Sequence, residues 1–239
     1  MVGSSEKKSK QQKDTTGDVV GGFAFFLSLV ALLPTGLIFF TLAIAQVRGA
    51  NITLTAIFLA SCLLGAILAQ VCIRGHISVL LHEFKHSLIS NLVGNKFKEM
   101  QINEHSGHVS YSYTKRTAHY NAFIALAPYI TPVFTFVSIL IAIACLRHTE
   151  IGTLMIVGLA YGADLLLNTR DISPVQTDIT LIRGGYSVGL LYIAAWNFIL
   201  AALILAWALQ GTEGLLTLLE ASSRFFFAIY FAVSGTGEA

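Results

Sequence analysis

The chain has 239 residues, of which 55% are hydrophobic and only 12% are charged, and its formal net charge is +2. The mean hydropathy is +0.71. These values lie well outside the range of ordinary soluble globular domains and exclude that class. They predict an α-helical integral membrane protein in contact with the lipid bilayer, and no nucleic-acid partner is expected.

The first 18 residues form a polar segment, MVGSSEKKSKQQKDTTGD, without apolar periodicity. We expect a disordered tail over residues 1–18 and one polytopic membrane domain over residues 19–239. The apolar run after the tail is too long for a cleavable signal peptide. Short lysine-rich segments stay inside the cell. A cytoplasmic N-terminus is therefore predicted by Lys7, Lys8, Lys10 and Lys13.

Several uncharged runs are long enough for a membrane span, which needs about 20 helical residues to cross a hydrocarbon core of roughly 30 Å. A fifth span is expected over Ile151–Asn168. The segment Leu215–Val233 is interrupted by Glu220 and Arg224 and is either a sixth span or an interfacial amphipathic helix. We therefore predict five to six transmembrane helices. The four clearest runs are Val19–Val47, Ile52–Ile73, Ala122–Leu146 and Tyr186–Leu209.

The segment Ile77–Val93 is too polar for an ordinary span and contains the sequence HEFKH. On a helix, His82 and His86 are one turn apart on the same face, so both imidazoles can bind a single ion. The carboxylate of Glu83 lies beside the first histidine, where it can accept a proton from water at the metal. This HExxH pattern indicates a zinc site in which Glu83 is the catalytic residue.

Two other interpretations of this segment need no metal. The histidines could be satisfied by hydrogen bonds between helices, or the segment could be an interfacial helix end from which Lys85 extends to the membrane surface. Ionisable groups among apolar helices are costly, and a functional site is their usual explanation. We therefore favour the metal site.

A catalytic zinc ion normally has three protein ligands and an open fourth position. We expect the third ligand to be Asp178, which precedes the helix that begins near Tyr186. Asp171 has the setting of a turn that ends a helix, and Asp164 could be a ligand or the partner of a buried donor. His105 and His108 are possible ligands, although a role in a solvated turn is favoured for both.

From Leu80 to Asn197 the sequence resembles the intramembrane zinc metalloproteases of the site-2 protease type, especially short bacterial relatives without a PDZ domain. HEFKHSLISNLVGNKFKEMQI resembles the HExxH helix of that family, followed by glycine and a strand. SGHVSYSY is similar to the second strand of its membrane-associated β-ribbon. ALAPYITPVF resembles the start of its next transmembrane helix, and QTDITLI its aspartate-bearing segment.

The resemblance implies that His82, His86 and Asp178 bind Zn²⁺ and that Glu83 is the general base. The familiar Leu-Asp-Gly motif is absent, and Thr177-Asp178-Ile179 stands in its place. It further implies a bacterial inner-membrane enzyme that hydrolyses peptide bonds of membrane protein or peptide substrates. An unwound substrate segment could add to the edge of the ribbon, or the ribbon could be an ordinary amphipathic hairpin that covers the site.

Three asparagines could orient substrate, although hydrogen bonding between helices is the favoured role for each: Asn121, Asn168 and Asn197. Two other classes of function remain open. A transporter or channel would place histidine, glutamate and aspartate along a path across the membrane. A non-catalytic scaffold would keep the fold without turnover.

Overall fold

The structure is a computed structural model of the chain and describes residues 22–49, 52–103, 106–112, 114–145 and 150–234. The expected tail over residues 1–18 and His105 lie outside these residues. The described part is mostly helical and includes an antiparallel sheet of two strands, β1 (Lys96–Ile102) and β2 (Gly107–Ser112). The helices are α1 (Gly22–Gly49), α2 (Ile52–Cys72), α3 (His76–Leu92), η1 (Ala118–Tyr120), α4 (Asn121–Ile130), α5 (Val133–Cys145), α6 (Glu150–Arg170), α7 (Thr177–Thr180) and α8 (Gly185–Ser234).

Four described helices, α1, α2, α6 and α8, are long and apolar enough to cross a membrane. The bent pair α4 and α5 adds a fifth when it is counted as one span. The expected runs Val19–Val47, Ile52–Ile73 and Ile151–Asn168 correspond to α1, α2 and α6. These helices support the expected membrane class, with four to five candidate spans in the described chain where five to six were expected.

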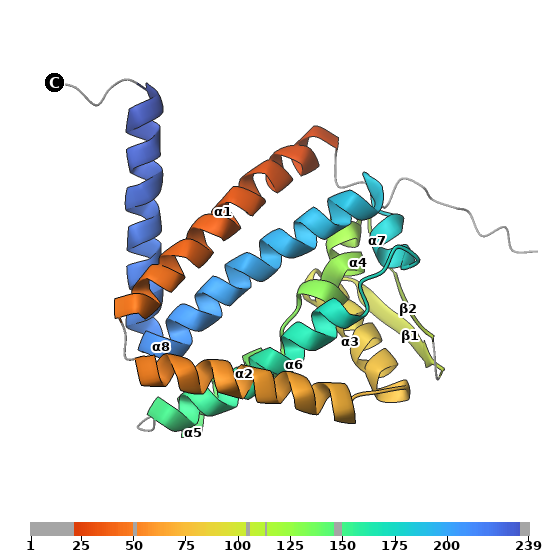
Figure 1. Cartoon of the computed structure of the whole chain (residues 1–239). Helices are drawn as coiled ribbons and strands as arrows, with labels where there is room; N and C mark the ends of the chain where they lie inside the picture. Colours follow the sequence, from red (N-terminus) through yellow and green to blue (C-terminus); the bar gives the residue numbers. More distant parts are fainter. Residues whose placement is uncertain (1–21, 50–51, 104–105, 113, 146–149, 235–239) are drawn as a thin grey trace, which may run out of the picture.

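The long helices pack in two pairs, and the short elements gather at one end of the molecule (Figure 1). α1 packs along α8, and α2 packs along α6. The sheet, α3, α4 and α7 lie together at the end of the molecule away from the last part of α8 (Figure 1). The paired helices thus form a scaffold, and the HExxH segment belongs to the smaller group beside it.

The contact between α2 and α6 is made by glycines. A Cβ atom on Gly65 would overlap the backbone of Leu159, and one on Gly162 would overlap the backbone of Cys62. Small residues at such contacts let two membrane helices approach closely. α6 is therefore fixed against α2, and so is its C-terminal end, from which the chain continues to Asp178.

The expected span Ala122–Leu146 is broken near its middle. α4 and α5 meet at an angle of 69°. Pro132 has no N–H group and disfavours helical backbone at the residue before it. Thr131 accordingly has φ −90° and ψ 112°, whereas Pro128 lies inside α4 without ending it. The break ends α4 beside α3 and starts α5 in a new direction.

α8 joins two segments that the sequence separates, Tyr186–Leu209 and Leu215–Val233. Its helical backbone is interrupted at Gly211, where φ is 65° and ψ is −144°. Glycine reaches positive φ without the steric cost that a side chain would add. The last part of α8 therefore turns sharply away (Figure 1). Its assignment as a sixth span or an interfacial helix stays a prediction.

The glycine contact between α2 and α6 predicts that Gly162→Val lowers the stability of the protein in detergent. The added side chain cannot fit against the Cys62 carbonyl, so the helices must move apart, at a typical overpacking cost of about 1–3 kcal/mol. Thermal unfolding followed by circular dichroism measures the effect. Gly49→Val is the control, because no atom lies within 4 Å of a Cβ there. Equal unfolding temperatures for both variants would contradict this account.

Candidate metal centre

α3 presents two histidines on one face. The ring centroids of His82 and His86 are 5.1 Å apart, and the His82 ring packs edge-on against Tyr129 of α4 at 5.6 Å. α3 is itself held on α4 by a buried contact of Ile89 with Ile124. The two imidazoles are thus set in place by packing between α3 and α4.

The short helix α7 carries Asp178 and is anchored by the next residue. Ile179 is fully buried in a cluster with Ile182 and with residues of α4 and α8. A Cβ atom on Gly189 of α8 would lie 2.6 Å from Cγ2 of Ile179, so this contact is close. The buried isoleucine fixes a helix of four residues that could not stand alone. Asp178 is thereby directed toward α3.

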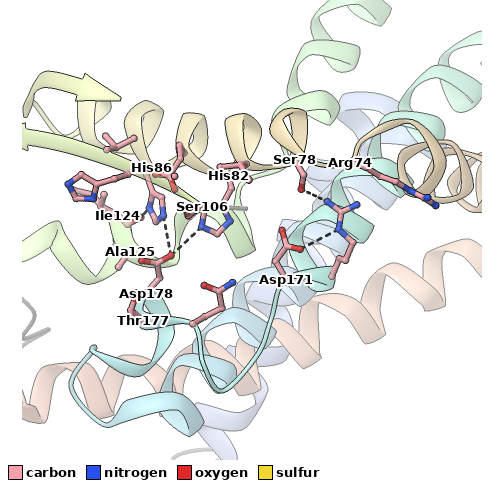
Figure 2. A pocket seen from close by; sticks show the side chains of 18 of the residues that line it. Arg74, Ser78, His82, His86, Ser106, Ile124, Ala125, Asp171, Thr177 and Asp178 are labelled. Carbon is pink, nitrogen blue, oxygen red and sulfur yellow. Dashed lines mark hydrogen bonds and ion pairs between the residues drawn. The ribbon is translucent and has the colours of Figure 1, made fainter. Parts of the chain in front are cut away.

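The two histidines and Asp178 meet at one point (Figure 2). Oδ2 of Asp178 lies 3.2 Å from Nε2 of His82 and 3.3 Å from Nε2 of His86. One ligand atom from each of the three residues lies within 4.8 Å of the other two. Two imidazole nitrogens and one carboxylate oxygen are a donor set that zinc takes at catalytic sites. The three residues could hold a metal ion.

The hydrogen bond of His86 supports this interpretation. A carbonyl oxygen can only accept, so Nδ1 of His86 carries the proton in its 2.8 Å contact with the Ile124 carbonyl. In the neutral ring Nε2 then has a lone pair that faces the Asp178 carboxylate. Two acceptors this close require a proton or a cation between them. A histidine whose second nitrogen binds a backbone carbonyl is typical of metal sites.

The same mutual attraction shifts the pKa values of Asp178 and His86. Burial alone would raise the pKa of Asp178, but hydrogen bonds from His82 and His86 outweigh it and hold this pKa below its usual range. Burial alone would lower the pKa of His86, but the hydrogen bond and charge of Asp178 outweigh it and raise this pKa. The site is therefore strongly attractive to positive charge.

Glu83 lies beside the cluster and is covered by the sheet. Glu83 is 7% exposed, and a Cβ atom on Gly107 of β2 would lie 2.6 Å from the Oε1 atom of the glutamate. Glycine at this position leaves room for the glutamate side chain. Burial raises the pKa of Glu83, while the two histidines oppose that effect. A carboxylate with a raised pKa is better suited to accept and release a proton near neutral pH.

A pocket of about 770 Å³ opens onto these groups. Its walls come from α3, β2, the start of α4, and the segment that joins α6 to α7. His82, Glu83, His86 and Asp178 all line it, and Asp178 keeps 30% of its side chain exposed. A metal ion at the cluster would therefore have an open side toward the pocket. Water and a polar peptide backbone could reach that side.

A comparison with models of protein families identifies the family of this chain. The model of the Peptidase M50B-like family matches residues 52–224. The chain belongs to the Peptidase M50B-like family. The expected membership of a site-2 protease type family is thereby confirmed, and proteases of this class are metalloproteases. No curated protein and no solved structure matches the chain significantly.

Among the described residues of this M50B-like chain, the other candidate ligands do not belong to the cluster. Asp164 is fully buried and accepts hydrogen bonds of 2.7 and 2.8 Å from N and Oγ1 of Thr135, as expected for the partner of buried donors. Asp171 follows the end of α6 and pairs with Arg170 at 3.3 Å. His108 lines the pocket from β2, so the expected turn position is wrong for this residue.

Sequence reasoning missed three features of the site. The sequence offered for Lys85 only the disfavoured alternative of an extension to the membrane surface, whereas the residue is 2% exposed and donates a hydrogen bond to Asn168. The other two features are the Ile124 carbonyl, which accepts from His86, and Gly107, which leaves space for Glu83. Both depend on tertiary packing, so a single sequence gives no signal for either. Asn168 and Asn197 do bond across helices, as expected.

Metal binding at this cluster is predicted to release protons and to weaken as the pH falls. The raised pKa of His86 means that a proton competes for Nε2 over a wider pH range, so affinity rises as the pH increases through that pKa. We expect a change of about tenfold per pH unit for each proton displaced. Calorimetric titration with Zn²⁺ in buffers of different ionisation enthalpy measures it. Affinity that does not vary with pH would contradict the prediction.

Proposed function

We propose that the protein is an intramembrane zinc metalloprotease that hydrolyses peptide bonds of membrane protein substrates. His82, His86 and Asp178 are the zinc ligands, and Glu83 is the general base. The observation that carries this proposal is the convergence of three ligand atoms within 4.8 Å beside a buried glutamate in an open pocket. The family match supports the same class of reaction.

The chemistry divides between the ion and the chain. A zinc ion in this position supplies Lewis-acid chemistry, which activates water and polarises a carbonyl. Glu83 accepts the proton of the attacking water and passes it to the leaving amine. The His86 hydrogen bond to Ile124 keeps Nε2 directed into the site. Burial under Gly107 limits the movement of the glutamate.

The substrate reaches this site as an extended segment. β2 lines the pocket, and within the described chain it pairs with β1 along one edge. A peptide unwound from a membrane helix can add a strand to the other edge, where backbone hydrogen bonds hold it without regard to sequence. In this proposal the two-stranded ribbon lies at the membrane boundary. A peptide paired with the other edge of β2 would have a carbonyl group close to the open side of the metal cluster.

The proposed setting is a bacterial inner membrane with the N-terminus and the pocket on the cytoplasmic side. Lysines and arginines are retained on that side of a membrane. Arg74 and Arg170 line the pocket, and two more basic residues, Lys96 and Lys98, are exposed on β1. Water from the cytoplasm would reach the cluster through this opening.

The arrangement of aspartates favours a protease over a transporter. A transport path would need acidic groups that follow one another across the membrane. Asp164 is instead enclosed by Lys85 and Thr135, and Asp171 is paired with Arg170. Asp178 alone among these three belongs to the described metal cluster. The three aspartates thus take part in three separate contacts, which favours the protease interpretation.

The decisive variant for the proposed function is Glu83→Gln. It keeps the size of the side chain and removes the base, so cleavage should fall by about 10²–10⁴-fold while bound zinc is retained. Detergent-solubilised bacterial membrane proteins are incubated with the parent or the variant protein. Mass spectrometry then counts new N-termini.

Glu99→Gln is the matched control, since Glu99 is an exposed carboxylate on β1. It should cleave at the rate of the parent. New N-termini that persist with Glu83→Gln would overturn the assignment of the base. A zinc-loaded parent that yields none would favour the scaffold interpretation.

A further inference from the structure

A second group of polar side chains lies buried between α3 and α6, outside the pocket. Lys85 is 2% exposed, and its Nζ donates a hydrogen bond of 2.5 Å to Oδ1 of Asn168. The same Nζ lies 4.0 Å from Oδ1 of Asp164, which is fully buried. Both acceptors belong to α6. One ammonium group therefore links the HExxH helix to a helix that carries none of the metal-binding side chains.

The second oxygen of Asp164 ties α5 to the same group. Oδ2 accepts hydrogen bonds from N and Oγ1 of Thr135, in the first turn of α5. The first N–H groups of a helix lack partners within the helix and carry partial positive charge, so a carboxylate is favoured there. Asp164 is thus held between an ammonium group and a helix N-terminus.

The break in the α4–α5 pair brings α4 into this group as well. Pro132 has no N–H, so the carbonyl of Pro128, four residues earlier, has no helical donor. Nζ of Lys85 lies 3.5 Å from that oxygen. α4 also carries Ile124, whose carbonyl binds Nδ1 of His86. The ammonium group therefore contacts the helix that orients one of the two histidines.

Arg170, at the end of α6, makes a second set of contacts with α3 and the segment before it. Nη1 of Arg170 donates to the Ile73 carbonyl at 2.9 Å, and Nη2 donates to Oγ of Ser78. Ser78 precedes His82 by one turn on the same helix (Figure 2). Ser78 and Lys85 are two turns apart, so they lie on the same side of α3. Two long cationic side chains thus set the distance between α3 and the end of α6.

We propose that Lys85, Asn168 and Asp164 form a positioning network that fixes α3 against α4 and α6 and so sets the geometry of the metal cluster. The chain runs from the end of α6 through a short segment to Asp178, so the place of α6 decides where that carboxylate meets His82 and His86. None of the three residues lines the pocket. The inference rests on the proposed zinc site but not on catalysis.

The test compares Lys85→Met, the double variant Lys85→Met/Asp164→Asn, and Asn168→Ala with the parent protein in detergent. Lys98→Met, at an exposed lysine of β1, is the matched control. Three properties are measured. They are zinc affinity in competition with a chelating indicator, the absorption spectrum of the Co²⁺-loaded protein, and the unfolding temperature. The spectrum reports the arrangement of ligands around the ion, which a loss of overall stability alone would not change.

Lys85→Met leaves the Asp164 carboxylate buried without its cation, so both the unfolding temperature and the zinc affinity should fall. The double variant removes both charges and restores the unfolding temperature toward that of the parent. It does not restore the link between α3 and α6. Its zinc affinity should stay lower than that of the parent by about tenfold or more, with an altered Co²⁺ spectrum. Lys98→Met should match the parent in all three.

A double variant with the zinc affinity and Co²⁺ spectrum of the parent would overturn the proposal and leave the network a purely structural one. If that variant does not fold, Asn168→Ala decides, because it keeps the charge pair and removes the 2.5 Å hydrogen bond. An unchanged affinity in Asn168→Ala overturns the proposal, and a reduced affinity supports it. A parent that binds no zinc overturns the proposed function and this inference together, whereas equal binding in parent and variants overturns this inference alone.

Discussion

The contact of Asp178 with His82 and His86 joins two distant parts of the chain. The histidines belong to α3, and the aspartate follows α6, with the sheet, α4 and α5 between them in sequence. An imidazole lone pair and a carboxylate repel each other unless a proton or a cation lies between them. The described fold brings them within 3.3 Å, so its stability at this point depends on positive charge. A bound metal ion would satisfy that requirement and lock the two parts together.

The helices around this contact are held together by buried polar groups, in which a charged side chain lies close to an opposite charge or a helix end. The ammonium group of Lys85 lies close to the Asp164 carboxylate, and the other oxygen of that carboxylate binds the start of α5. Removing one partner of such a buried pair typically costs about 3–5 kcal/mol. The α2–α6 glycine contact supports the same helix from its other side. In the proposed account, α6 positions both groups of candidate metal ligands relative to each other.

One proline and one glycine help to shape the site. Pro132 interrupts a segment that composition alone makes a single span, and the break ends α4 beside α3, where Ile124 can accept from His86. Gly107 leaves the space that Glu83 occupies. In both places a residue that lacks an ordinary group, the N–H of Pro132 or the Cβ of Gly107, affects the position of a side chain that belongs to another element.

The parts of this arrangement that sequence can predict are those set by local geometry. A helix places residues four apart on one face, so the pairing of His82 and His86 is readable directly. Apolar length likewise predicts α1, α2 and α6. The choice among Asp164, Asp171 and Asp178 is different, because it depends on Lys85 and Arg170 occupying the other two carboxylates. Those partnerships arise from tertiary packing, and Lys85 has no local feature that distinguishes it from a surface lysine.

The most direct test of the central claim is the metal content of the purified protein. Elemental mass spectrometry on the detergent-purified parent should find about one zinc per chain, as a single three-ligand site requires. The metal should be lost in His86→Ala and in Asp178→Ala and kept in Asp171→Ala, whose carboxylate pairs with Arg170 instead. A folded parent without zinc, or an Asp178→Ala variant that keeps its zinc, would contradict the account.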